Sequence, residues 1–96
     1  MDIGILWRWL APKSRQRPDL CFLLYTRADC PLCDEAWELL GRYQRRYGFK
    51  LESMDVDESA ELACEFGNCV PVVVVNGTLR FRGKVNEVLL QRLLTR

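Results

Sequence analysis

The architecture of this 96-residue chain is set between residues 20 and 33, where the sequence reads Leu20-Cys21-Phe22-Leu23-Leu24-Tyr25-Thr26-Arg27-Ala28-Asp29-Cys30-Pro31-Leu32-Cys33. The first seven residues are almost continuously apolar, which predicts a central strand covered on both faces. Pro31 is typical of the first position of a helix, because an N–H group there would have no partner within the helix. We therefore expect a strand that passes directly into a helix, with two cysteines at the junction.

After the cysteine pair, the hydrophobic pattern switches between helical and extended periods. Apolar residues at intervals of three and four predict helices over 31–47, 57–66 and 85–93. Residues 49–56, 70–75 and 78–82 have the composition of strands. Asn76-Gly77 joins the last two strands and favours a two-residue hairpin turn, because both positions then adopt positive φ. The predicted order is βαβαββα.

This order predicts an α/β fold with one mixed four-stranded sheet flanked by helices. A strand-helix-strand unit is parallel and right-handed, whereas the hairpin adds an antiparallel pair. Glu52 and Ser53 interrupt the second strand, and an outer strand tolerates such polar residues best. Helices on both faces of the sheet would explain why the first and third strands are apolar throughout.

Length and composition indicate one globular domain over residues 19–96, preceded by an extension over residues 1–18. The net charge is only +1, with 28% charged and 49% hydrophobic residues. No excess of basic residues points to nucleic acid as a partner.

The extension contains the apolar segment Ile3-Gly4-Ile5-Leu6-Trp7-Arg8-Trp9-Leu10, followed by a polar linker between Pro12 and Pro18. Eight residues cannot span a bilayer, which needs about 20. The segment suits either a membrane interface or packing as a short helix or arm against the domain or a second copy. We expect packing against protein rather than lipid.

The chain contains five cysteines and no histidine. The missing histidine excludes Ser-His and Cys-His nucleophile pairs and any histidine-ligated metal. An odd number of cysteines cannot pair completely within one chain, so a reducing compartment, the cytoplasm, is predicted.

The pair Cys30-Pro31-Leu32-Cys33 is predicted to carry dithiol chemistry. Unpaired N–H groups and the positive end of the helix dipole stabilise a thiolate at Cys30, which lowers the pKa of a cysteine below its ordinary value of about 8.5. Cys33 lies one turn further along the same helix face. Cys30 would attack a partner disulfide, and Cys33 would resolve the mixed disulfide. Arg27 would favour the thiolate.

A second hypothesis is a metal site, since Cys-x-x-Cys also occurs in zinc and iron–sulfur proteins and Cys64 and Cys69 would supply two further thiolates. A tetrahedral site of this kind would have to join the Cys30-Cys33 pair in one half of the fold to Cys64 and Cys69 in the other half. The strand-then-helix context favours the redox interpretation, with no metal. A purely non-catalytic interaction module is the third alternative.

From Tyr25 to Ala36 the sequence, Tyr25-Thr26-Arg27-Ala28-Asp29-Cys30-Pro31-Leu32-Cys33-Asp34-Glu35-Ala36, resembles the glutaredoxin branch of the thioredoxin-fold superfamily, in particular small glutaredoxin-like proteins of uncharacterised role. Val70-Pro71 before a strand completes the resemblance, which covers about residues 19–96. It implies that Pro71 is cis and that the backbone of Val70 pairs with an extended substrate segment. We assign Val70, Pro71 and Arg27 to substrate binding.

The chain departs from typical glutaredoxins at three positions. Leu32 replaces an aromatic residue, Arg82-Gly83 stands where a Gly-Gly pair is usual, and Asn86 replaces an aspartate that would accept the ammonium group of glutathione. The charges of Arg80, Arg82 and Lys84 are expected to form a solvated strand edge.

The remaining cysteines and Trp37 are expected to be structural. Cys21 and Trp37 are predicted to lie in the core, Cys64 to pack from its helix, and Cys69 to lie in a loop near the reactive end. The alternative for Cys69 is glutathionylation or pairing with Cys64, and we favour the structural role. The sequence thus predicts a cytoplasmic thiol-disulfide oxidoreductase that reduces protein or glutathione mixed disulfides. It requires no bound cofactor, and glutathione is a candidate reductant.

Overall fold

A computed structural model describes residues 16–96, and the expectations for residues 3–10 lie outside this range. The strands are β1 (Cys21–Thr26), β2 (Lys50–Asp55), β3 (Val72–Val75) and β4 (Thr78–Arg82). The helices are α2 (Pro31–Tyr47), α3 (Ala60–Phe66) and α4 (Glu87–Leu94), with a 3-10 turn, η2 (Val56–Glu58), after β2. The element order agrees with the predicted βαβαββα.

The four strands form one mixed sheet in the order β2-β1-β3-β4. β1 is parallel to β2 and antiparallel to β3, and β4 is antiparallel to β3. The predicted mixed sheet is therefore confirmed. The apolar strands β1 and β3 are central, whereas β2, with exposed Glu52 and Ser53, lies at an edge.

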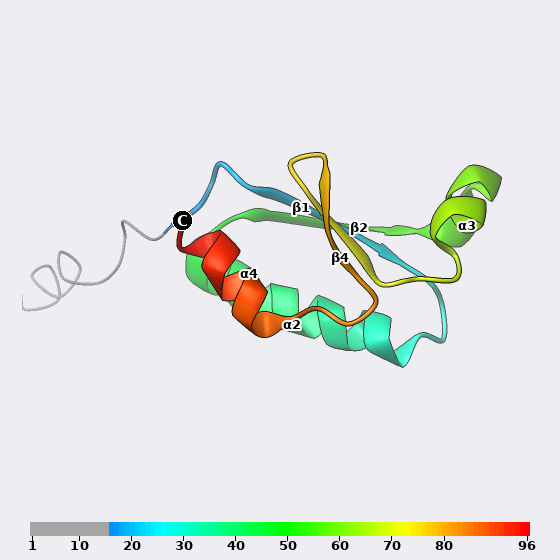
Figure 1. The fold of residues 1–96 in the computed structure, drawn as a ribbon, viewed down its shortest axis with the longest axis horizontal. Helices are drawn as coiled ribbons and strands as arrows, with labels where there is room; N and C mark the ends of the chain where they lie inside the picture. Colours follow the sequence, from blue (N-terminus) through cyan, green and yellow to red (C-terminus); the bar gives the residue numbers. More distant parts are fainter. Residues whose placement is uncertain (1–15) are drawn as a thin grey trace, which may run out of the picture.

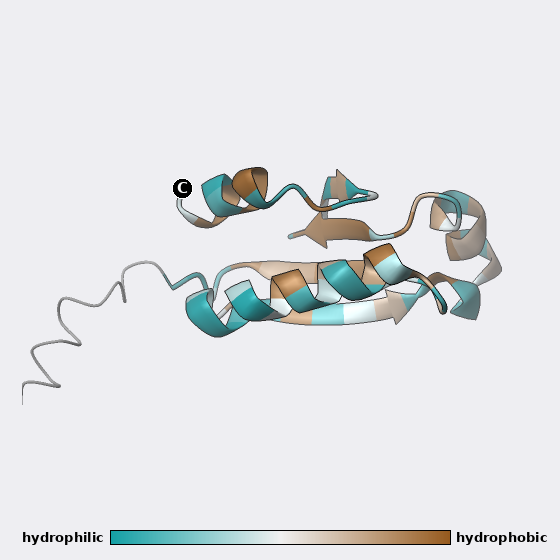
Figure 2. Cartoon of the chain, turned by 90° about the horizontal axis from the view of Figure 1, so that it is seen from below, coloured by the Kyte–Doolittle hydropathy of each residue, from teal (hydrophilic) through white to brown (hydrophobic). Residues whose placement is uncertain are grey.

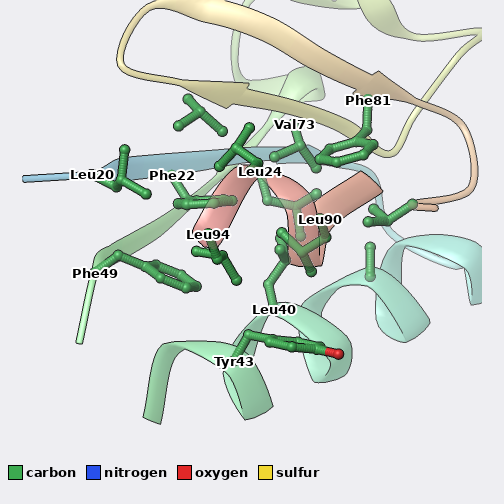
Figure 3. Packing of buried hydrophobic residues seen from close by; sticks show 14 of the residues in the cluster. Leu20, Phe22, Leu24, Leu40, Tyr43, Phe49, Val73, Phe81, Leu90 and Leu94 are labelled. Atoms are coloured by element: carbon green, nitrogen blue, oxygen red, sulfur yellow. The ribbon is translucent and has the colours of Figure 1, made fainter. Parts of the chain in front are cut away.

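Helices α2 and α4 lie together against one face of the sheet (Figure 1). Hydrophilic and hydrophobic residues alternate along α2 (Figure 2), so only one face of this helix is apolar. Leu40 of α2 and Leu90 of α4 are both fully buried where the two helices meet the sheet (Figure 3). The main core therefore lies between this helix pair and the alternate strand residues that face it, among them Phe22, Leu24, Val73 and Phe81.

A smaller apolar cluster lies on the opposite face of the sheet. Phe66 of α3 stacks on Tyr25 of β1 with ring centroids 4.8 Å apart, next to buried Val56 and Val72. Helices thus pack on both faces, but the short α3 contacts only one end of the second face (Figure 1).

The start of α3 differs from the prediction. A continuous helix from Asp57 was expected, but η2 ends at Glu58 and α3 begins at Ala60. The Ser59 hydroxyl accepts the N–H of Leu62 at 3.3 Å, so Ser59 caps a new helix instead of continuing the previous turn.

Three residues expected to be buried are exposed. Cys21 begins β1 and lies on the face that α3 only partly covers. Trp37 is 44% exposed, because one step along α2 from buried Ala36 turns its side chain out of the core. Cys64 is exposed on α3, where Phe66 supplies the buried contact instead. The predictions for these three side chains were wrong.

Candidate functional site

Cys30 is the N-cap residue of α2. Its backbone is extended, with φ −117° and ψ 98°, and Pro31 occupies the first helical turn. The N–H of Cys33 donates to Cys30 Sγ at 3.2 Å. The Cys30 sulfur therefore occupies the place where an N-cap oxygen usually accepts the free N–H groups of a helix.

Cys30 and Cys33 form a disulfide, and their Cα atoms are 5.2 Å apart. This separation lies within the range usual for disulfides, so the helix start already has the spacing that the bond needs. The two cysteines differ in exposure: Cys33 is only 1% exposed, whereas Cys30 is half-buried. Cys30 is therefore the more accessible residue of the pair.

The sheet register brings the predicted substrate-binding segment to the same end of the domain. Tyr25 pairs with Val72, so the end of β1 that leads to Cys30 lies next to the start of β3, which Pro71 precedes. The Val70–Pro71 peptide bond is cis. The N–H of Gly83 contacts the carbonyl oxygens of Pro71 at 2.8 Å and of Cys69 at 3.2 Å. Residues 69–71 are thereby joined to the end of β4.

Arg27 is held by protein groups on the α3 side of this end. Its Nε and Nη2 donate to the two carboxylate oxygens of Asp57 at 3.0 and 2.9 Å, and its Nη1 donates to the Gly67 carbonyl at 2.9 Å. The side-chain hydrogen bonds between them lower the pKa of Asp57 and raise that of Arg27, because each stabilises the charged form of the other. The assignment of Arg27 to substrate binding stays a prediction.

Asp57 and Gly67 did not emerge from the sequence as site residues. Asp57 is only the first residue of the helix predicted over 57–66, and Gly67 follows the last residue of that helix. They lie 30 and 40 residues from Arg27 in the chain. No short motif in the sequence links these positions, so their contact becomes visible only in the folded chain.

Asn86, where glutaredoxins have aspartate, is the N-cap of α4. Its Oδ1 accepts the N–H of Leu89 at 3.1 Å. A hollow of about 640 Å³ lies between the start of α4 and α2. Exposed Leu32 lines it together with Leu39 and Val85, and charged groups of both signs surround these apolar side chains: Glu35, Arg42, Lys84 and Glu87. The residue between the two cysteines therefore borders a surface with both apolar and charged groups.

No three His, Cys, Asp or Glu side chains within residues 16–96 gather as metal ligands. Within the same residues, no helix has the length and apolarity needed to cross a bilayer.

The mixed sheet, the helices on both faces and a Cys-x-x-Cys disulfide at the start of α2 define a protein of the thioredoxin fold. A thioredoxin from Halobacterium salinarum has this fold, with a TM-score of 0.62, 22% sequence identity and coverage of 81% of this chain and 76% of that one. The Glutaredoxin-like domain family (DUF836) matches residues 22–95. The chain belongs to this family.

Relatives of the chain include both solved structures and curated sequences. A protein from X. campestris solved by X-ray is 33% identical, with a TM-score of 0.62 over 77% of this chain and 95% of that one. A "Probable Thioredoxin" of Methanothermobacter thermautotrophicus is 33% identical over 63 residues, 62% of this chain and 74% of that protein. An uncharacterized protein of Mycobacterium bovis is 35% identical over 69 residues, covering 67% and 71%. The thioredoxin-like fold and the Cys30–Cys33 pair at disulfide distance support a redox-type role.

Proposed function

We propose that the protein is a thiol-disulfide oxidoreductase in which Cys30 is the nucleophile and Cys33 the resolving cysteine. The observation that carries the proposal is the unequal burial of two bonded cysteines at a helix start. Attack on another molecule requires an accessible cysteine, and within the pair Cys30 is the more exposed residue. Resolution is intramolecular and needs no access from outside.

The reaction transfers two electrons to the substrate. The Cys30 thiolate attacks one sulfur of a substrate disulfide, a mixed disulfide forms, and the second substrate sulfur leaves as a thiolate that takes up a proton. Cys33 then loses its proton and attacks Cys30 Sγ. The Cys30–Cys33 disulfide forms as the mixed disulfide breaks, and the first substrate sulfur leaves and is protonated. Substrate is reduced and the protein dithiol is oxidised.

The proposed substrate is a protein disulfide or a mixed disulfide with glutathione. Its extended segment would pair with the backbone of Val70 beside Pro71, and its apolar side chains would contact the hollow next to Leu32. A low-molecular-weight thiol such as glutathione would return the protein to its dithiol form, without a bound cofactor.

The free cysteines Cys21, Cys64 and Cys69 support a reducing compartment as the place of action. We therefore propose a cytoplasmic location.

Trapping with a Cys33→Ser variant tests the function. The variant should form a mixed disulfide with insulin chains whose thiols carry thionitrobenzoate, because Cys30 attacks the labelled chain sulfur and thionitrobenzoate leaves as a thiolate. This adduct should persist, because the resolving sulfur is absent. Mass spectrometry of the adduct should locate the bond at Cys30. Wild-type protein should release such an adduct and catalyse insulin reduction by dithiothreitol. If wild-type protein accelerates neither insulin nor glutathione mixed-disulfide reduction, the proposed function is wrong.

The acidity of Cys30 gives a second prediction. In reduced protein the thiolate absorbance near 240 nm should rise with a midpoint below about 8.5, the pKa of an ordinary cysteine, because free helix N–H groups stabilise the anion. A Cys30→Ser variant should lose this transition, whereas Cys21→Ser should retain it. A midpoint at or above the ordinary value would contradict thiolate activation.

Visible absorption or bound zinc in protein purified under reducing conditions would favour the metal hypothesis instead.

A further inference from the structure

The ion pair of Arg27 connects three segments that are distant in the chain. Arg27 directly follows β1, Asp57 belongs to η2 after β2, and Gly67 ends α3. Two hydrogen bonds join the guanidinium to both oxygens of Asp57, which fixes its plane, and the third reaches the Gly67 carbonyl. One side chain thus fixes the end of α3 relative to the end of β1.

Both segments that leave this junction lead to the proposed reactive end. Residues 28–30 run from Arg27 to Cys30, and residues 68–71 run from Gly67 to Pro71. The second segment is short and turned, since the N–H of Cys69 donates back to the Phe66 carbonyl at 2.9 Å. Gly67 and Pro71 are therefore joined by a short segment that contains a hydrogen-bonded turn.

Gly67 lies against the Arg27 side chain at a position that has no room for a Cβ atom. It is buried and has ordinary helical dihedrals, φ −55° and ψ −31°, so its backbone does not require glycine. A Cβ atom at this position would clash with the Ala63 carbonyl and would lie 3.0 Å from Arg27 Nη2. The absence of a side chain allows the close packing of the guanidinium against the end of α3.

The Arg27 guanidinium already donates hydrogen bonds to acceptors within the protein. Three of its N–H groups point at Asp57 and Gly67, and the Asp57 carboxylate balances its charge. A substrate carboxylate could bind in the same bidentate way only by displacing Asp57, which is part of the same chain.

We propose that Arg27 is a positioning residue, which holds the Gly67–Pro71 segment at the distance from Cys30 that substrate binding requires, and does not itself bind the substrate. This inference rests on the proposed function. Asp57 and Gly67 take part in the same positioning contact, because both accept hydrogen bonds from Arg27.

Kinetics of Arg27→Met, Asp57→Asn and the double variant test the proposal. Met keeps an apolar stem but removes every N–H donor. With insulin as substrate, each single variant should raise KM by about fivefold to tenfold with little change in kcat, and the double variant should be no worse than either single one, since all three break the same junction. If Arg27 instead binds substrate, Asp57→Asn would free the guanidinium and leave KM unchanged or lower. That outcome would overturn the proposal.

The ion pair of Arg17 and Asp19 provides a matched control at the opposite end of the domain. Arg17 likewise contacts both oxygens of its aspartate, at 3.2 Å each, and donates to backbone carbonyls, those of Leu93, Leu94 and Arg96. Asp19→Asn should leave KM unchanged. An equal rise of KM in Asp19→Asn would mean that general destabilisation, not positioning, causes the effect.

Amide hydrogen exchange supplies a readout that does not depend on activity. In Arg27→Met and Asp57→Asn the N–H groups of Cys69 and Gly83 should exchange about tenfold faster, while that of Leu24 in β1 should be unaffected. Unchanged exchange at both positions would overturn the proposal even if KM rises. If wild-type protein has no reductase activity, the proposed function fails, and the exchange rates alone decide whether Arg27 holds the segment.

Discussion

Replacing Cys30 with serine should bring insulin reduction down to the rate of dithiothreitol alone, a loss of more than about 100-fold. Serine has nearly the same size, but its hydroxyl stays protonated at neutral pH and is a poor nucleophile toward sulfur. Cys33 cannot replace the lost nucleophile, because it is 1% exposed. Turbidity from the precipitating insulin B chain measures the rate.

A serine at Cys21 provides the control for this substitution. Cys21 is also exposed, but it lies at the opposite end of β1 from the segment that leads to Cys30. Cys21→Ser should retain wild-type activity. A Cys30→Ser variant with full activity would remove Cys30 from the mechanism, and full activity in Cys33→Ser as well would show that the pair does not act as a dithiol.

The largest effect on stability is expected for Leu90→Ala. Leu90 is fully buried between α4, α2 and the sheet (Figure 3), so the truncation removes apolar contacts and leaves a cavity. The free energy of unfolding should fall by about 2–5 kcal/mol. Urea unfolding of the oxidised protein, followed by circular dichroism, measures this change.

Leu89→Ala is the matched control, because the same substitution is made one residue away on the same helix. Leu89 is 48% exposed. Its replacement should change the free energy of unfolding by less than about 0.5 kcal/mol. Equal losses in the two variants would mean that α4 does not pack through Leu90, and the description of the main core would be wrong.

Local signals predicted much of the candidate site. Cys30 was expected at the start of a helix because Pro31 and the preceding apolar run are close in sequence, and Cys30 is the N-cap of α2. The Asn76-Gly77 turn was predicted on the same basis, and both residues have positive φ, 49° and 83°. Such features depend on backbone preferences and contacts within a few residues, which a sequence displays directly.

Exposure of single side chains was predicted less well. Cys21 and Trp37 are hydrophobic residues in regular elements and were therefore assigned to the core. Both are exposed, since burial depends on the direction of a side chain and on what covers that direction. The short α3 leaves the Cys21 end of its own face of the sheet without a helix, which hydrophobicity along the chain does not reveal.

The amino-acid order alone therefore accounts for the succession of helices and strands, the mixed sheet and the placement of two cysteines at a helix start, because each follows from short-range periodicity, turn preferences and chain connectivity. The unequal burial of Cys30 and Cys33 and the junction of Arg27 with Asp57 and Gly67 arise only when the chain has folded. Both depend on contacts between residues far apart in sequence, and the packing of the helices on the sheet determines which of those contacts form.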